Sequence, residues 1–116
     1  MWSVDVGLIA EWLASLDVDS REQVVAAIRL LEDRGPQLGR PIVDSVTDSK
    51  YANMKELRPG SSGRSELRAL FAFDPKRQAI MFVAGDKAGN WDRWYKKNIP
   101  VADDLFDDHL RSLKGK

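Results

Sequence analysis

The spacing of hydrophobic positions changes along the chain and marks its predicted elements. Trp2 to Val6 allow a short first strand. After them, apolar residues recur at every third or fourth position, as on one face of a helix. Two such stripes follow each other: Ile9, Trp12, Leu13 and Leu16, and then Val24, Ala27, Ile28 and Leu31. The spacing predicts two helices joined by a short turn.

The ends of the second helix carry their own signals. Ser20 and Gln23 have the spacing of a capping box, which predicts that this helix begins at Ser20. Gly35 followed by Pro36 predicts its end, because glycine accepts a left-handed conformation and proline cannot continue a helix. The stretch from Pro36 to Lys50 has no clear period, and we interpret it as an irregular connection.

After this connection the period falls to two, which is typical of β-strands. Strand-like runs cover Tyr51 to Arg58, Ser65 to Phe73 and Ala79 to Ala84. A last helix is predicted near Pro100, with Ala102, Leu105, Phe106 and Leu113 facing inward. The order favours an α+β fold in which an N-terminal helical hairpin packs on one face of a small antiparallel sheet. That sheet is a three-stranded meander plus the N-terminal strand, and a C-terminal helix follows it.

Length and composition narrow the class of protein. The 116 residues are predicted to form a single domain, 1–116. The sequence has no cysteine, which excludes disulfides and cysteine zinc sites and favours the cytoplasm. The longest apolar runs are too short to span a membrane, and no signal peptide is evident at the N-terminus. We therefore expect a cytoplasmic protein without a membrane partner.

Charge is unevenly distributed, although the total is zero. Residues 1–49 hold four Arg and Lys against nine Asp and Glu, whereas residues 50–97 hold eleven against five. Residues 98–116 hold three against four. The central part is therefore basic, which indicates a basic working surface on an acidic support.

Alternation within the strands assigns side chains to faces. Leu67, Ala69, Phe71 and Phe73 share the core side of the middle strand, so Arg68 points to the other side. A turn centred on residue 62 would place Glu56 almost opposite Arg68 and put Arg58 one pleat away. Two interpretations of Glu56, Arg58 and Arg68 are open. They form a phosphate-binding face, because a guanidinium binds phosphate in a bidentate manner, or they form a cross-strand ion pair on a solvated surface.

The segment from Gly85 to Lys97 combines four cations with three aromatic rings. Such alternation suits single-stranded nucleic acid, because bases stack on rings while Lys and Arg neutralise phosphates. The alternative is a loop that packs its tryptophans into the core.

No other residue in the sequence points to a ligand. His109 is expected to have a structural role. Asp103, Asp104, Asp107 and Asp108 are expected to lie on the surface near the start of the last helix. No metal site and no cofactor motif is evident, so no cofactor is expected.

Three motifs in this order resemble the RelE/ParE toxins, and most closely their HigB-like, phage-derived group. They are Met54 to Arg58 on one strand, Leu67 to Phe73 on the next, and Ala79 to Val83 leading into a lysine-bearing segment. The resemblance covers nearly the whole chain and implies a RelE-like fold. The chain differs from the family pattern in two respects. Asp86 to Asp92 lengthen a segment that relatives often fill with a tight run of lysines, and the chain is neutral overall, whereas many active relatives are distinctly basic.

The resemblance implies the toxin of a type II toxin–antitoxin system. Most relatives are endoribonucleases, or mRNA interferases, that cleave mRNA on the ribosome without a metal and so inhibit translation. The implied partners are mRNA, the ribosome and a cognate antitoxin, often of the helix-turn-helix type, through which the complex binds operator DNA. The implied catalytic residues are Arg58, Arg68, Lys87 and Tyr95, and the implied RNA-binding residues are Lys55, Arg93, Trp94, Lys96 and Lys97.

Two other functions fit the same fold. A ParE-like member would inhibit DNA gyrase without catalysis. A catalytically inactive member would serve as a binding module. An enzymatic role therefore needs the strand arginines and the segment from Lys87 to Lys97 to converge on one face.

Overall fold

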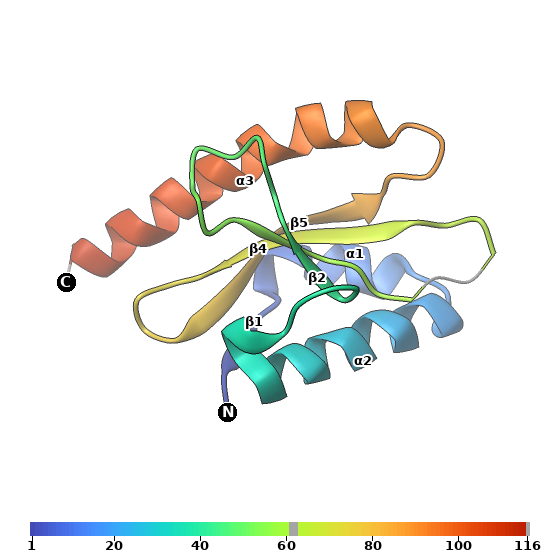
Figure 1. Ribbon diagram of the computed structural model, residues 1–116, viewed down its shortest axis with the longest axis horizontal. Coiled ribbons are helices and arrows are strands. Elements are labelled where there is room, and N and C mark those ends of the chain that lie inside the picture. The colour runs from blue at the N-terminus through green and yellow to red at the C-terminus, as the bar shows by residue number, and fades with distance from the viewer. Residues whose placement is uncertain (61–62, 116) are drawn as a thin grey trace.

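The computed structural model, which describes residues 1–60 and 63–115, is a mixed sheet placed between helices (Figure 1). No helix in these two ranges has the length and apolar character that crossing a membrane requires. The elements in chain order are β1 (Ser3–Asp5), the short 3-10 helix η1 (Gly7–Ile9), α1 (Ala10–Ser15), α2 (Val18–Arg34), a second 3-10 helix η2 (Gly35–Gln37), β2 (Val43–Ser45), β3 (Lys55–Leu57), β4 (Leu67–Phe73), β5 (Gln78–Asp86) and α3 (Trp91–Lys114).

The sheet has five strands in the order β1-β5-β4-β3-β2. β1 runs parallel to β5, and all other neighbours are antiparallel. The predicted meander and N-terminal strand are confirmed. The prediction for Pro36 to Lys50 was wrong in one part, because β2 forms there and pairs with β3. β2 is an edge strand of three residues, too short to show a period of two.

Helix α2 begins earlier than predicted. Its N-cap is Asp17, whose carboxylate accepts a hydrogen bond from the Ser20 backbone N–H at 3.1 Å. Ser20 itself is buried inside the first turn, so the predicted start at Ser20 was wrong. The predicted end is confirmed: Gly35 has a φ of 57°, and a Cβ there would meet the ring of Trp2.

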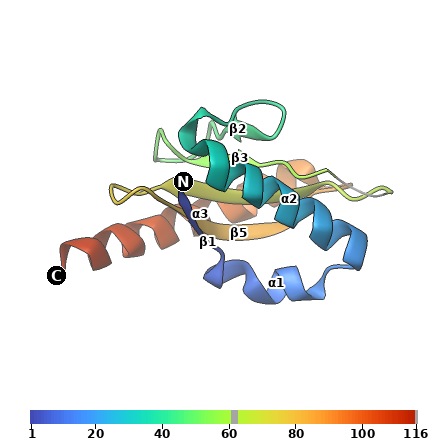
Figure 2. The ribbon, with the colours of Figure 1, turned by 90° about the horizontal axis from the view of Figure 1, so that it is seen from below.

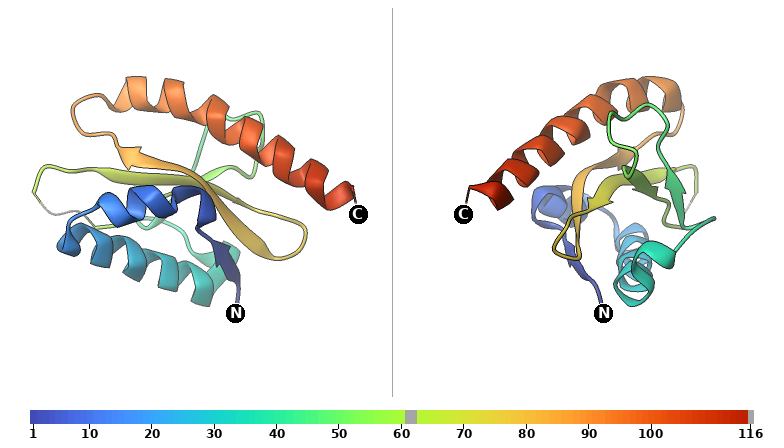
Figure 3. Two further views of the ribbon diagram at one scale, coloured as in Figure 1. Left: turned by 180° about the vertical axis from the view of Figure 1, so that it is seen from behind. Right: turned by 60° about the vertical axis from the view of Figure 1, so that its left-hand side comes forward.

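Helices cover both faces of the sheet, which corrects the prediction that they cover one. Helices α1 and α2 pack against one face, which includes Phe71 and Met81. Helix α3 packs against the other, which includes Leu70 and Phe82. Figures 2 and 3 show the strands between α2 and α3. The run Ala69-Leu70-Phe71-Ala72 in β4 is buried at every position, as expected for a strand covered on both sides.

Helix α3 begins at Trp91, nine residues before the predicted start near Pro100, which lies inside the helix and is exposed. Proline removes one backbone hydrogen bond and costs about 3 kcal/mol in a helix interior. Burial of Ile99, Ala102 and Phe106 on one face of α3 offsets this cost. The segment from Gly85 to Lys97 is therefore largely helical, because only residues 87–90 form a loop.

A contact between Asp74 and His109 fixes the distal part of α3 to the β4–β5 turn. The Asp74 carboxylate is buried, lies 2.8 Å from His109 Nε2, and accepts the backbone N–H groups of Lys76 and Gln78. Burial raises the pKa of Asp74, but the His109 and turn hydrogen bonds outweigh it and hold the pKa below the ordinary value of 3.8. His109 thus has the structural position expected for it.

The Asp74→Asn variant is expected to be less stable at neutral pH by about 1–3 kcal/mol, because the charge-assisted hydrogen bonds are lost. A carboxyl with a lowered folded pKa stabilises the protein above its unfolded pKa and stops doing so as pH falls through the folded value. The stability deficit of the variant should therefore shrink below about pH 4. Urea unfolding of both proteins between neutral and acidic pH measures this. A deficit that is constant across the range would contradict it.

Candidate functional site

A buried carboxylate, Glu56 of β3, lies at the centre of the candidate site. Its side chain is nearly inaccessible, and its two oxygens accept hydrogen bonds from different partners. The Tyr95 hydroxyl donates to Oε2 at 2.6 Å, and Arg58 donates to Oε1 from Nε at 2.9 Å and from Nη2 at 2.7 Å. These contacts offset the free-energy cost of burying the Glu56 carboxylate.

The register differs slightly from the predicted one. Glu56 lies opposite Leu70 rather than opposite Arg68, because the β3–β4 connection is centred on residue 63 instead of 62. A shift of two positions along the partner strand leaves every side chain on its predicted face. Glu56, Arg58 and Arg68 therefore do share one face, but α3 covers part of that face.

The two arginines differ in how they are paired. Arg58 Nη2 also lies 3.2 Å from Asp44 of β2. Burial lowers the pKa of Arg58, but the hydrogen bond and charge of Glu56, with Asp44, outweigh it and raise the pKa. Within residues 1–60 and 63–115, Arg68 has no carboxylate partner: Nη1 donates to the Leu67 carbonyl, and its buried Nε has no acceptor. The charge of Arg68 is therefore free to bind an anion.

Tyr95 connects Glu56 to Arg68. Burial raises the pKa of Tyr95 to about 12, the hydrogen bond and charge of Glu56 act in the same direction, and Arg68 acts in the opposite one. The phenol is therefore protonated at physiological pH and donates to Glu56.

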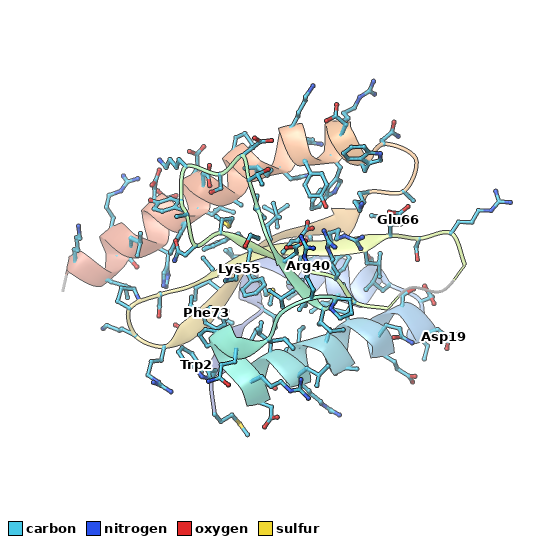
Figure 4. All side chains as sticks on the ribbon, in the orientation of Figure 1. Trp2, Asp19, Arg40, Lys55, Glu66 and Phe73 are labelled. Carbon is cyan, nitrogen blue, oxygen red and sulfur yellow. The ribbon has the colours of Figure 1, made fainter. Side chains whose placement is uncertain are left out.

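Lys87 stands next to this group at the end of β5. Its Nζ lies 5.6 Å from the centre of the Tyr95 ring and 5.8 Å from that of Trp91. The same ammonium is 3.3 Å from Glu66, which lies near the start of β4 (Figure 4). The structure thus brings together all four residues that the sequence analysis assigned to catalysis: Arg58, Arg68, Lys87 and Tyr95.

An open hollow of about 250 Å³ gives access to the group. We call it the front hollow, and its lining includes Ser45, Asp48, Glu56, Arg58, Trp91 and Tyr95. The ring of Trp91 is 59% exposed, which leaves it available for stacking.

The wall formed by residues 46–48 is held in place by α3. Asp103 accepts hydrogen bonds from the Ser49 hydroxyl and, at 3.1 Å, from the Lys50 backbone N–H. Asp107 binds the Lys50 ammonium and the Tyr51 hydroxyl. The prediction that these aspartates are surface groups near the helix start was wrong, because α3 starts at Trp91 and Asp103 is buried.

The predicted RNA-binding residues are not all in one place. Trp94 is partly buried and meets Tyr95 edge-on, with ring centres 5.3 Å apart. Arg93, Lys96 and Lys97 are exposed on the first turns of α3, and Lys96 pairs with Asp92 at 3.3 Å. Lys55 has its side chain on the opposite face from Glu56, so it does not join the front hollow.

The sequence analysis weighed Glu56 only as an ion-pair partner. Only a weak signal was available: alternation puts Glu56 on the same face as apolar Met54 and cationic Arg58, and a carboxylate is rarely buried unless it has a specific partner. Trp91 and Asp44 were also not assigned, the first because its segment was expected to be a loop. Among the described residues, no group of three His, Asp or Glu side chains could hold a metal ion.

The Tyr95→Phe variant is expected to lose about 1–3 kcal/mol of stability, because Glu56 Oε2 keeps its burial but loses its donor. Urea unfolding measures the loss. Trp91→Phe is a suitable control, since its exposed ring makes little contact with the core. Equal stability of the Tyr95→Phe variant and the wild type would mean that Glu56 does not depend on this hydrogen bond.

With this geometry established, comparison with known proteins is informative. Residues 11–107 match the family described as Phage derived protein Gp49-like (DUF891). This chain belongs to that family. The kinship expected from the strand motifs, with the phage-derived, HigB-like group, is thereby confirmed.

Two relatives of this Gp49-like chain come from Mycobacterium tuberculosis (strain ATCC 25618 / H37Rv). The chain is 58% identical to "Putative toxin HigB2" over 97% of its own length and 56% of that protein's length. It is 52% identical to "Putative toxin HigB3" over 92% of its own length and 91% of that protein's. The chain thus spans little more than half of HigB2 but nearly all of HigB3. No solved structure gives a significant match.

Proposed function

We propose that this chain is the toxin of a toxin–antitoxin pair and that it cleaves messenger RNA on the ribosome. The observation that carries the proposal is that Tyr95 interacts both with buried Glu56, which lines the front hollow, and with Arg68, which has no carboxylate partner within residues 1–60 and 63–115. The names of the two mycobacterial relatives support the toxin role. By the same likeness, a cognate antitoxin of the helix-turn-helix type is the proposed partner, and through it the pair would bind operator DNA in the cytoplasm.

The proposed reaction uses a nucleophile that RNA already contains. The 2′-hydroxyl attacks the adjacent phosphorus while the bond from phosphorus to the 5′-oxygen breaks, which yields a 2′,3′-cyclic phosphate and a 5′-hydroxyl. Glu56 accepts the proton of the 2′-hydroxyl, and Lys87 donates one to the departing 5′-oxygen. Arg68 stabilises the negative charge that builds on the phosphorane.

The other residues prepare Glu56 for this role. Arg58 contacts Oε1 through both Nε and Nη2, whereas Oε2 accepts from Tyr95 and keeps a second lone pair that can take a proton. Because the pKa of Tyr95 is about 12, its phenol remains a donor and fixes the orientation of the carboxylate. The exposed Trp91 ring at the edge of the hollow is suited to stack on a flanking base.

The test uses a translation extract with purified protein and a defined mRNA. We expect new 5′ ends within codons, each with a 5′-hydroxyl, and none when ribosomes are removed from the extract. Expression in cells should arrest growth, and co-expression of the adjacent reading frame should relieve the arrest. Intact mRNA in the complete extract would refute the proposal.

The same preparation separates the alternatives. Inhibition of DNA supercoiling by gyrase, with mRNA left whole, would identify a ParE-like inhibitor. Absence of both effects, with retained binding to the adjacent gene product, would identify an inactive binding module. The satisfied buried carboxylate favours an enzyme, because a surface that only docks a partner does not need one.

A further inference from the structure

A second hollow lies on the other side of the edge strand β2. It measures about 250 Å³, and Arg40 and Lys55 contribute to its lining. We call it the rear hollow. Ser45 lines both the front and the rear hollow, so the two meet at β2. No strand pairs with the outer edge of β2 among the described residues, so β2 is the edge strand that separates the two hollows.

One carboxylate links the rear hollow to the arginines of the site. Asp44 Oδ2 lies 3.2 Å from Arg58, and Asp44 Oδ1 lies 3.2 Å from Nε of Arg40. The backbone N–H of Ser45 and then Arg40 lower the pKa of Asp44, so the link stays charged. Arg40 and Arg58 are therefore held on the two sides of a single carboxyl group.

The two cations of the rear hollow are available to a ligand. The side chain of Arg40 is 79% exposed. Lys55 has no carboxylate partner within residues 1–60 and 63–115. Figure 4 shows Arg40 and Lys55 close together near the middle of the molecule, as their shared hollow requires. Arg40 shares its carboxylate partner with Arg58, so neither Arg40 nor Lys55 has its charge fully neutralised. Two such cations close to a proposed phosphate site suit the regularly spaced negative charges of a nucleic-acid strand.

We propose that Arg40 and Lys55 form a second phosphate-binding subsite, which holds the messenger strand where it crosses β2 on its way out of the front hollow. The inference rests on the proposed function and adds to it the path of the substrate. It also gives Lys55 a role on the face where the structure places it. A plainer account is that charged side chains protect the edge strand from pairing with another chain.

Salt dependence distinguishes these accounts. The probe is a short single-stranded RNA with 2′-O-methyl groups, which lacks the nucleophile and is not cleaved. Binding is followed by fluorescence anisotropy between about 50 and 200 mM salt, where each phosphate contact contributes about 0.7 to the slope of log affinity against log salt concentration. The Arg40→Gln/Lys55→Gln variant should bind more weakly, with a slope smaller by about 1.4 than that of the wild type.

The matched control is Arg29→Gln/Lys76→Gln, which removes the same two types of charge from exposed positions on α2 and in the β4–β5 turn. Its slope should stay close to that of the wild type. An equal loss in both variants, an unchanged slope in the Arg40→Gln/Lys55→Gln variant, or no binding of the probe by the wild type would overturn the subsite. Aggregation of the Arg40→Gln/Lys55→Gln variant with RNA binding intact would support the protective account instead.

Cleavage assays keep this inference separate from the proposed function. If the wild type cleaves mRNA but the slope does not change, the subsite is refuted and the nuclease stands. If the wild type does not cleave, the proposed function itself has failed. The variant should still sediment with ribosomes, because its defect concerns the message. Loss of that association would assign Arg40 and Lys55 to ribosomal RNA and refute the proposed path.

Discussion

The Arg68→Ala variant is expected to cleave mRNA about 100- to 1,000-fold more slowly than the wild type, because removal of one charge-stabilising donor from an active site has effects of this size. The variant should remain folded. Within the two described ranges, the buried Nε of Arg68 has no acceptor and no carboxylate pairs with the guanidinium. The measurement is the initial rate of appearance of cleaved ends in the translation extract, together with a urea unfolding curve.

Two further variants sharpen this test. Arg29→Ala removes an arginine from the exposed surface of α2 and should keep most of the activity. Arg68→Lys keeps the charge but loses the bidentate geometry, so its rate should fall between those of the alanine variant and the wild type. Full activity of a folded Arg68→Ala variant would remove this residue from the mechanism.

The second large effect is expected for Glu56→Gln, which should lower the cleavage rate by about 100- to 10,000-fold, the usual contribution of a general base. Glutamine has nearly the same shape: its amide oxygen can accept from Arg58 while its amide nitrogen donates to the Tyr95 hydroxyl oxygen, so the side chain keeps a partner on each side and the variant should fold. It cannot take the proton of the 2′-hydroxyl. The measurement is the initial rate of appearance of cleaved ends in the translation extract, with a urea unfolding curve as the check on folding.

A conservative control accompanies this variant as well. Glu22→Gln makes the same chemical change on the exposed surface of α2 and should leave the rate unaltered. If Glu56→Gln cleaves at the wild-type rate, the carboxylate serves only to hold Arg58 and Tyr95, and the proton must go elsewhere. Comparison of the two glutamine variants therefore separates a chemical role from a structural one.

Elements with many buried positions could be predicted from the sequence, and elements defined by their neighbours could not. The run from Leu67 to Phe73 is apolar at every position except Arg68, and it forms the central strand as expected. β2 exists because β3 lies beside it, and a three-residue sequence carries no such information. The start of α3 was missed because Pro100 is a strong local signal, whereas burial of Ile99 and Phe106 is a tertiary effect that outweighs it.

Part of the candidate site could be predicted for a similar reason. Side-chain alternation has a period of two, so Arg58 and Arg68 were placed on the correct face even though the register was shifted. The resemblance implied Lys55 as an RNA-binding residue, but its position next to Glu56 in the strand puts its side chain on the other face. Glu56 was undervalued because its burial depends on Tyr95, which comes from an element 39 positions away in the chain.

Helix α3 supplies both the hydroxyl that orients Glu56 and the aspartates that anchor residues 49–51. The same helix shields Leu70 and Phe82 from water. The candidate site and one side of the hydrophobic core are therefore completed by the same helix. A chain that ended before residue 91 would lack the Tyr95 hydroxyl and would leave Leu70 and Phe82 without the cover of α3.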